Sequence, residues 1–411
     1  MSDHNEPSKY KVEPSKHKVE PSKHRVATTL SHAGNKPRAF HGFVNPPVVR
    51  GSTVLFPDAA TMERRNQRYV YGLHATPTTD ALTEAVDALE GSAGTILVPS
   101  GLAAVTIPLL AFLKPGDHAL VVDSVYSPTR RFCDGLLRDL GVETTYYDPS
   151  AGAGIATLMR PDTRVVFTES PGSNTYEVQD IPAIADVAHR HGAVVMMDNT
   201  WATPLFFKPL DFGVDVSIHA ATKYPAGHSD VLMGFVSANE KHWPRLRETQ
   251  LQLGINSAPD DCYLVLRGLR SMGVRLGHHQ QSALALATAL QDRPGVAHVL
   301  HPALPDFPGH ALWKRDFKGA SGLFSIVLSG KGKPQSWRAT AHAFLDALEI
   351  FGLGYSWGGY ESLAVHVSLA DRTIAKGPAE GPVIRLQIGL EDTDDLMADI
   401  ERGLAAANAV E

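Results

Sequence analysis

Residues 196–230 read MMDNTWATPLFFKPLDFGVDVSIHAATKYPAGHSD, and this stretch decides the fold. The uncharged run 194–197 ends at Asp198 and is typical of a strand buried inside a parallel sheet. Apolar and polar residues then alternate over 214–219, which predicts a second strand shortly before Lys223. Because open α/β sheets bind ligands at the carboxyl ends of their strands, Asp198 and Lys223 are predicted to face one crevice.

These two side chains suit one kind of chemistry. A carboxylate can keep a ring nitrogen protonated and a lysine can form an imine, and pyridoxal phosphate requires both. Asp198 could equally cap a turn, and Lys223 could be a solvated charge of a loop. The pair alone therefore leaves the function open, and further sequence features are needed to choose between these interpretations.

Length and composition describe an ordinary globular chain. Its 411 residues suffice for two domains and an arm, with 43% apolar and 20% charged residues. The net charge of −6 argues against general nucleic-acid binding, and Cys133 and Cys262 are too few for a disulfide framework. The run 103–113 is too short to cross a bilayer, and the N-terminus lacks the apolar core of a signal peptide. We therefore expect a soluble, cytoplasmic protein without nucleic-acid or membrane partners.

Metal binding is not expected. Histidine pairs such as His278 and His279 have no acidic or cysteine partner at a persuasive ligand spacing. Surface or packing roles therefore fit these histidines better than coordination.

The first 26 residues contain a seven-residue repeat, EPSKYKV, EPSKHKV and EPSKHRV, beginning at Glu6, Glu13 and Glu20. Heptads often form coiled coils, but each unit has a helix-breaking proline and too few apolar residues for a packed seam. We predict a disordered tail over residues 1–26. Its slight excess of lysine and arginine leaves a tether for an anionic partner as an alternative.

Beyond the tail, residues 27–73 are rich in Gly, Pro and His and are predicted to form an extended arm. Between residues 79 and 219, strand-like and helix-like segments alternate, which predicts a mostly parallel sheet covered by helices on both faces. At 95–101 a strand leads through Ser-Gly into a helix, a turn whose free N–H groups suit a phosphate. Helical patterns dominate residues 241–300, including 264–269 and a long run at 274–290, and strands are predicted at 321–328 and 383–388, so a smaller α+β domain is expected from about residue 270.

The order of several short motifs resembles the pyridoxal-phosphate enzymes of cysteine and methionine metabolism, the transsulfuration family. The resemblance covers about residues 28–407, and its motifs are Tyr71-Gly, Thr76-Pro-Thr78, Pro99-Ser-Gly101, Glu169-Ser-Pro-Gly172, Asp198-Asn-Thr200, Ala221-Thr-Lys-Tyr224, Gly227-His-Ser-Asp230 and Leu266-Arg-Gly-Leu269. It implies an α/β architecture of fold type I, like aspartate aminotransferase, with a large, mostly parallel seven-stranded sheet. The cofactor domain would comprise residues 74–269 and the C-terminal domain residues 270–411. The arm would contact a neighbouring subunit in a homotetramer, a dimer of dimers.

The resemblance also assigns roles around the cofactor, pyridoxal 5′-phosphate. Lys223 would hold it through an imine and would later remove a proton from the substrate. Asp198 would pair with the ring nitrogen, and Tyr126 would stack on the ring and assist proton movement. The expected phosphate ligands are the backbone N–H groups of Gly101 and Leu102, the Thr222 hydroxyl and, from a neighbouring subunit, Tyr71.

For the substrate, the resemblance implies that Arg385 binds the α-carboxylate by a two-point contact that lysine could not reproduce. Ser356, Trp357 and Tyr360 would line the substrate site. Together with Trp201 after Asp-Asn-Thr, this segment resembles cystathionine β-lyases. The implied reaction is β-elimination of L-cystathionine to homocysteine, pyruvate and ammonia, with cysteine desulfhydrase activity as a possible extension. A γ-eliminating relative is the alternative, and a non-catalytic protein that binds an acidic partner through its tail is another.

Three positions depart from the family. Leu73 stands where the family has a phosphate-binding arginine, so the phosphate would be held by fewer charges. Ala220 replaces a serine that often precedes the lysine by three residues. Arg131 stands where well-known β-lyases have an acidic residue near the distal amino group of cystathionine, which puts the identity of the substrate in question.

Overall fold

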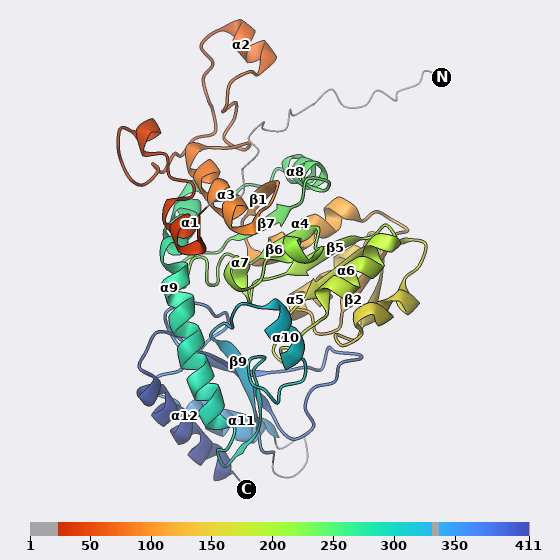
Figure 1. Cartoon of the computed structure of the whole chain (residues 1–411), viewed down its shortest axis with the longest axis vertical. Helices are drawn as coiled ribbons and strands as arrows, with labels where there is room; N and C mark the ends of the chain where they lie inside the picture. The colour runs from red at the N-terminus through yellow and green to blue at the C-terminus, as the bar shows by residue number, and fades with distance from the viewer. Residues whose placement is uncertain (1–23, 331–336, 411) are drawn as a thin grey trace.

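The computed structural model describes residues 24–330 and 337–410. Residues 1–23, the greater part of the predicted disordered tail, therefore lie outside the described residues. Within the described part, two sheets are each packed with helices, and one long helix runs beside both (Figure 1). No helix of these described residues is both long enough and apolar enough to cross a membrane.

The larger sheet has seven strands in the order β1-β7-β6-β5-β4-β2-β3. β7 runs antiparallel to both of its neighbours and the other pairs are parallel, which confirms the predicted mostly parallel sheet. Val121, Val166 and Met196 on the central strands are fully buried, as expected for a sheet with helices on both faces. The strands are β1 (Gly94–Val98), β2 (His118–Val122), β3 (Glu143–Tyr147), β4 (Thr163–Glu169), β5 (Val194–Asp198), β6 (Val216–His219) and β7 (Gly234–Ala238).

Helices α3 and α4 cover opposite faces of this sheet. The Thr95 hydroxyl of β1 donates to Asp87 of α3 and bonds Ser237 of β7 on the same face. Gly234 points to the other face of β7, where a Cβ atom would lie 2.8 Å from Ala104 of α4. The helices of this part are α3 (Pro77–Glu90), α4 (Gly101–Phe112), α5 (Ser127–Phe132), η2 (Cys133–Leu137), η3 (Gly152–Leu158), α6 (Ile181–Arg190), α7 (Thr203–Phe206), η4 (Pro209–Phe212) and α8 (Trp243–Gln252).

A single 32-residue helix, α9 (Pro259–Leu290), leads from the large sheet to a smaller one. It contacts α1 and α3 near the large sheet and α12, β8 and β9 near the small one. Residue 270, the expected domain boundary, lies inside this helix. The smaller sheet has the order β10-β11-β12-β9-β8 and forms the expected smaller C-terminal unit. Its elements are β8 (Val296–Leu300), α10 (His310–Asp316), β9 (Leu323–Leu328), α11 (Trp337–Asp346), β10 (Gly352–Leu353), β11 (Leu363–Val367), β12 (Val383–Gln387) and α12 (Thr393–Asn408).

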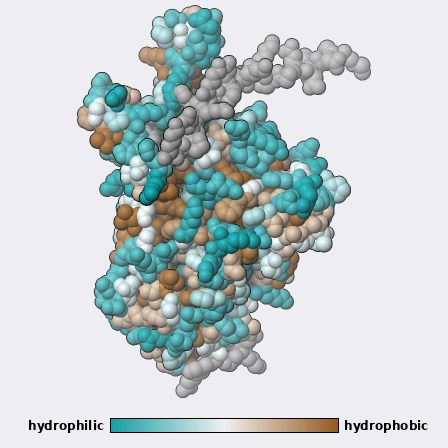
Figure 2. Space-filling view, in the orientation of Figure 1, coloured by the Kyte–Doolittle hydropathy of each residue, from teal (hydrophilic) through white to brown (hydrophobic). Residues whose placement is uncertain are grey.

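The N-terminal segment contains α1 (Val26–His32), η1 (Pro37–Phe40) and α2 (Ala59–Arg64). α1 packs on α3 and α9, whereas the segment around α2 projects away from both sheets (Figure 1). Phe43 and Leu55 in the projecting part are 73% and 85% exposed, and Figure 2 shows apolar surface there. Apolar surface that is contiguous and exposed in a single chain marks a site of interaction with another protein or a membrane.

Candidate active site

Asp198 and Lys223 come from neighbouring strands of the large sheet. Asp198 ends β5 in register with Ile218 of β6, and Lys223 follows β6 after a short turn. Oδ1 of Asp198 accepts hydrogen bonds from the Thr200 nitrogen (3.0 Å) and hydroxyl (2.6 Å). Burial raises the pKa of Asp198, while the Thr200 bonds and the positive charge of Lys223 oppose that change. A nearby cationic ring nitrogen would be a further partner that favours the carboxylate.

The amine of Lys223 has an unusual environment for a lysine. Burial lowers its pKa to about 8; the charge of Arg385 adds to this shift, and Asp198 opposes it. A large share of the amine is therefore neutral near pH 8, whereas an exposed lysine of pKa ~10.4 stays protonated there. The Lys223 Nζ donates to the Ser356 hydroxyl at 2.6 Å and lies 5.3 Å from the centre of the Trp357 ring.

Ser356 connects this amine to the predicted carboxylate site. Its carbonyl accepts a hydrogen bond from Nη2 of Arg385 at 3.1 Å. Its φ of 78° lies in the left-handed region, which costs energy for a residue with a Cβ atom and persists where surrounding contacts fix it. At Gly358, with φ 86°, a Cβ atom would lie 2.8 Å from the Tyr224 nitrogen, so the turn is pressed against the backbone that carries Lys223.

Arg385 lies on β12 of the small sheet, paired with Ser325 of β9 and Val365 of β11. Burial lowers its pKa, although Tyr176 and Tyr126 act in the opposite direction, and arginine remains cationic at any physiological pH. Its guanidinium has five N–H donors, and the bond to Ser356 uses one of them. The remaining donors can bind a carboxylate by two hydrogen bonds.

Tyr126 lies at the start of α5, on the large domain's side of the site. Its backbone nitrogen donates to Oε2 of Glu169 at 2.7 Å. Burial, reinforced by the negative charges of Glu169 and Asp198, raises the pKa of its phenol. The arginines 385 and 131 oppose this shift, which places Tyr126 between the acidic and the basic side of the site.

Glu169 is a site residue for which we predicted no role. It ends β4 in register with Asp198 of β5, so two carboxylates stand side by side at the carboxyl edge of the sheet. Burial and the charge of Asp198 raise the pKa of Glu169 well above its usual value. The sequence signal was the motif Glu-Ser-Pro-Gly after a buried strand, but the pairing with Asp198 appears only in the sheet register.

The predicted phosphate site is at the N-terminus of α4. The Ser100 hydroxyl caps this helix by accepting from the Ala103 nitrogen at 3.1 Å, and no described residue accepts from the N–H groups of Gly101 or Leu102. A Cβ atom at Gly101 would lie 2.5 Å from that of Ala220, so the helix start and the Lys223 turn are in close contact. The Thr222 hydroxyl, another predicted phosphate ligand, already has partners: it donates to the Met233 carbonyl (3.2 Å) and accepts from the Met233 nitrogen (3.0 Å).

Tyr71 is not brought to the other site residues within the described part of this chain. It pairs with Thr53 in an isolated bridge of the arm and its side chain is 46% exposed. Leu73 and His74 line a cleft of about 1330 Å³ between the arm, α3 and α8, which contains none of Lys223, Asp198 or Arg385. This cleft is therefore separate from the candidate active site.

Tyr360, predicted for the substrate site, and Trp201, which follows Asp-Asn-Thr, make contacts of other kinds. Tyr360 has an exposed side chain, and its carbonyl accepts from the Leu390 nitrogen. Trp201 is buried and donates to the Leu323 carbonyl at 3.0 Å, so it joins the two sheets. The Thr200 hydroxyl accepts from the nitrogen of Ala220. Among the described residues, no group of three or more His, Cys, Asp or Glu side chains is placed to hold a metal ion.

These residues fit pyridoxal phosphate in three respects. Lys223 offers a buried amine with a lowered pKa, and both bonds from Thr200 end on Oδ1 of Asp198, which leaves Oδ2 for a ring N–H. The start of α4 offers two backbone N–H donors and a positive helix end to a phosphate. A fold type I sheet with this lysine and aspartate at its carboxyl edge defines a pyridoxal-phosphate-dependent enzyme.

Comparison with known proteins agrees with this class. The family described as Cys/Met metabolism PLP-dependent enzyme matches residues 27–405, and this chain belongs to that family. A protein of Rhizobium johnstonii named "Putative cystathionine beta-lyase" is 70% identical over 383 residues, which cover 93% of this chain and 96% of that protein. Cystathionine beta-lyase MetC of Escherichia coli is 44% identical over 390 residues, covering 92% of this chain and 98% of MetC.

A solved structure shows the same architecture. It is a cystathionine gamma synthase from Xanthomonas oryzae pv. oryzae in complex with cystathionine, 33% identical to this chain, with a TM-score of 0.87. The match covers 95% of this chain and 100% of the synthase. The fold therefore carries both synthesis and cleavage within the family, and the site must distinguish them.

Proposed function

We propose that this chain is a cystathionine β-lyase, which cleaves L-cystathionine to homocysteine, pyruvate and ammonia. The observation that carries the proposal is the Lys223 amine, which has a lowered pKa and contacts Ser356 beside Arg385. An amino acid held by its carboxylate at Arg385 would present its Cα to this amine. Relatives that are named cystathionine β-lyases support the choice of substrate.

Arg385 and Ser356 orient the substrate. The guanidinium of Arg385 binds the α-carboxylate through two N–H groups, and its bond to the Ser356 carbonyl fixes the plane of the fork. Trp357 covers the lysine from the same turn, which keeps water away from the amine. Orientation of this kind replaces a random encounter by a fixed geometry and can contribute several kcal/mol.

Lys223 moves the proton. When bound, pyridoxal phosphate supplies an electron sink that makes the Cα proton of the substrate acidic. The neutral Lys223 amine removes this proton, the electron pair of the C–H bond forms a double bond to Cβ, and the Cβ–S bond breaks. Lys223 then returns the proton to the leaving sulfur, which departs as the thiol homocysteine. Water hydrolyses the remaining three-carbon fragment to pyruvate and ammonia.

Asp198 and Tyr126 support this sequence. The carboxylate of Asp198 keeps a proton on the ring nitrogen, as its position at the end of β5 allows. The raised pKa of Tyr126 keeps its phenol protonated at neutral pH, so it can donate a hydrogen bond at the site. Both residues hold protons at fixed places while Lys223 moves one.

The identity of the 2-oxo acid tests the proposed reaction. We expect pyruvate and homocysteine in equal amounts when the purified enzyme is incubated with L-cystathionine. A γ-eliminating relative would release 2-oxobutyrate and cysteine instead. Release of 2-oxobutyrate as the main 2-oxo acid would replace the proposed function by that alternative.

We also propose a homotetramer of paired dimers in which Tyr71 of the partner subunit binds the phosphate. The exposed apolar side chains of the arm and the separation of Tyr71 from Lys223 in one chain support this assembly. The charged cleft beside Leu73 and His74 would face the partner subunit. A cytoplasmic location is part of the proposal and fits two buried, unpaired cysteines, Cys133 and Cys262.

A further inference from the structure

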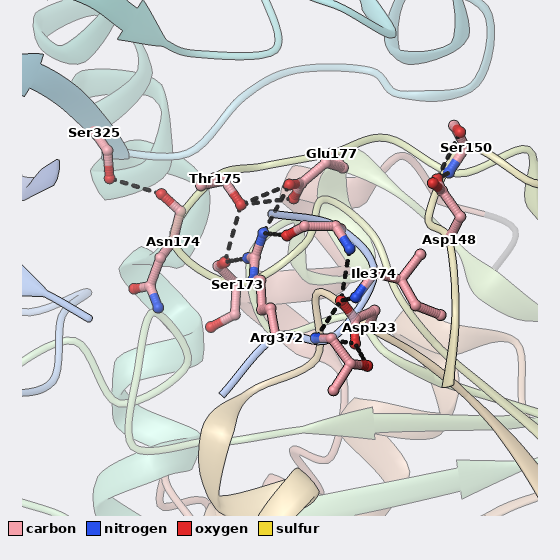
Figure 3. A network of polar contacts seen from close by, with 12 residues as sticks. Asp123, Asp148, Ser150, Ser173, Asn174, Thr175, Glu177, Ser325, Arg372 and Ile374 are labelled. Carbon is pink, nitrogen blue, oxygen red and sulfur yellow. Dashed lines mark hydrogen bonds and ion pairs between the residues drawn. The ribbon is translucent and has the colours of Figure 1, made fainter. Parts of the chain in front are cut away.

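The segment between β11 and β12 is fastened to the large domain by one buried carboxylate. Asp123 follows β2, and its side chain is fully buried. It accepts hydrogen bonds from three successive backbone nitrogens, at 3.1 Å from Thr373, 2.8 Å from Ile374 and 2.7 Å from Ala375 (Figure 3). Arg130 neutralises the same carboxylate at 2.6 Å. Charge-assisted hydrogen bonds of this kind are among the strong ones in proteins.

Arg372, from the same segment, makes a second connection. Its side chain is 4% exposed and donates to Oε1 of Glu177 at 2.9 Å and to the Ser173 carbonyl (Figure 3). The segment 172–177 that it contacts has two non-glycine residues with left-handed backbone, Asn174 (φ 66°) and Tyr176 (φ 62°). Such a backbone persists where its surroundings fix it, and Arg372 supplies part of that support.

A third contact lies directly beside the predicted carboxylate site. The Ser325 hydroxyl donates to the Asn174 carbonyl at 2.8 Å, and Ser325 of β9 is paired in register with Arg385 of β12. The segment 172–177 is therefore tied to the C-terminal unit twice, by Arg372 of the β11–β12 connection and by Ser325 on the strand next to Arg385.

The other end of this network leads to Tyr126. Asp123 precedes Tyr126 by three residues, and the Tyr126 nitrogen is held by Glu169, the residue at the start of the Glu-Ser-Pro-Gly motif. Ser124 lies between Asp123 and Tyr126 in the chain, and its carbonyl accepts from the Ser173 nitrogen at 2.8 Å. The short stretch that carries Tyr126 is thus joined to the small domain through Asp123 and through segment 172–177.

We propose that Asp123, Arg372 and Glu177 form an interdomain clamp that positions Arg385 relative to Tyr126 and Lys223. The three are positioning residues: they act through the placement of the groups that meet the substrate. The inference rests on the proposed function, since that function assigns Arg385 to the substrate carboxylate. The clamp keeps the two domains in the arrangement that binds substrate, so turnover needs no large domain closure.

A carboxylate that only stabilises the fold should not affect substrate binding when it is replaced. The chain contains a matched control of this kind. Asp399 is also fully buried and accepts three successive backbone N–H groups, from Glu349 (2.8 Å), Ile350 (2.8 Å) and Phe351 (2.9 Å). It also has an arginine partner, Arg402, at 2.7 Å. All of these partners lie within the C-terminal unit, so Asp399 matches Asp123 in chemistry but joins no second domain.

The experiment compares Asp123→Asn, Arg372→Gln and Asp399→Asn in the holoenzyme. An asparagine amide would face the N–H donors, so both Asp variants should unfold at a lower temperature. The clamp variants should in addition raise KM for L-cystathionine and the dissociation constant of glycine, measured by calorimetry, on the order of tenfold. Their kcat should change less than their KM. Asp399→Asn should leave KM and glycine binding unchanged.

Several outcomes would overturn the clamp. One is a KM change in Asp399→Asn equal to that in Asp123→Asn; another is unchanged KM and glycine binding in both clamp variants. If Asp123→Asn does not fold, the KM of Arg372→Gln tests the clamp instead. Arg372→Lys keeps the charge but loses the planar guanidinium, so its KM should lie between those of Arg372→Gln and wild type. Arg385→Gln tests the proposed function in the same assay. An unchanged KM in Arg385→Gln would overturn that function and the clamp's role with it. A raised KM in Arg385→Gln together with an unchanged KM in the clamp variants would overturn the clamp alone.

Discussion

The amine of Lys223 and the hydroxyl of Ser356 are 2.6 Å apart although 133 residues separate them in the chain. Lys223 follows a strand of the large sheet, and Ser356 lies between strands β10 and β11 of the small one. The candidate site therefore exists only where both domains meet. Changes at the domain contact should affect substrate binding, and changes at Lys223 or Asp198 should affect the chemistry.

The first prediction concerns Asp198. Replacing it by asparagine keeps the size of the side chain and its bonds to Thr200 but removes the charge that we propose keeps the ring nitrogen protonated. Loss of a charged hydrogen bond of about 2–3 kcal/mol corresponds to a fall in kcat on the order of 10²-fold. KM should change little, because Arg385 is intact. Steady-state kinetics on cystathionine checks this, and wild-type kcat in the variant would show that another residue protonates the ring.

The lowered pKa of Lys223 predicts a pH dependence for cofactor attachment. Only the neutral amine can attack the aldehyde of pyridoxal phosphate, and a lower pKa makes it neutral at a lower pH. The attachment rate to cofactor-free protein should rise with pH and level off above a pKa of about 8. The charge of Arg385 helps to lower the pKa of Lys223, so Arg385→Gln should raise that pKa and shift the start of the plateau to higher pH. Mass spectrometry after borohydride reduction measures the attached fraction. A plateau near the ordinary lysine value of ~10.4 would contradict the burial of Lys223.

Assembly can be tested by mixing two impaired variants. If Tyr71 acts in the partner's site, a mixed dimer of Tyr71→Ala and Lys223→Ala subunits contains one site with native Lys223 and native Tyr71. Activity should therefore reappear when the two variants are unfolded together and refolded. Each variant refolded alone is the control. No recovery in a mixture that forms dimers would mean that Tyr71 serves its own chain or no site at all.

Asp123 should contribute to stability against acid. Its hydrogen bonds to residues 373–375 outweigh its burial and lower its pKa to about 2, below the unfolded value. A lowered carboxyl pKa stabilises the fold above the unfolded pKa, and the contribution is lost as pH falls through the folded pKa. About 1 kcal/mol should be lost between pH 7 and pH 3, and about 2.5 kcal/mol in all at still lower pH. Urea unfolding of wild type and Asp123→Asn at both pH values checks this. An identical pH dependence in both proteins would contradict it.

The elements around the site were predictable where local pattern decides structure. The run 194–197 and the alternation over 214–219 became β5 and β6; Asp198 ends β5, and Lys223 follows β6 after a short turn. The elements not predicted depend on tertiary context. β10 has only two residues, and β8, with the sequence VAHVL, lacks the strict apolar–polar alternation of a half-buried strand, so neither is marked as a strand by its local pattern.

Helix α9 shows a different reason for an incomplete prediction. Separate helical patterns were expected at 264–269 and 274–290, but the structure has one helix from Pro259 to Leu290. Gly268 weakens the pattern because glycine is a poor helix former. Its reason is tertiary: a Cβ atom there would lie 2.2 Å from the Pro225 carbonyl oxygen, so only glycine lets α9 approach the backbone after Lys223.

The contacts that set the site geometry were beyond the reach of sequence reasoning. Asp123 bonds residues about 250 positions away, and Glu169 meets Asp198 only through the sheet register. Neither distance follows from periodicity or propensity. Such contacts follow from how two domains pack, which a local pattern does not determine.

The most direct test of the account is the rate of pyruvate release from L-cystathionine by wild type and by Lys223→Ala. We expect steady release of pyruvate by wild type, because in the proposed reaction the neutral Lys223 amine removes the Cα proton. The variant should retain the fold by circular dichroism, lose the covalently attached cofactor and show no turnover above background. Pyruvate release by Lys223→Ala at a rate near that of wild type would contradict the account, since another group would then have to move the proton.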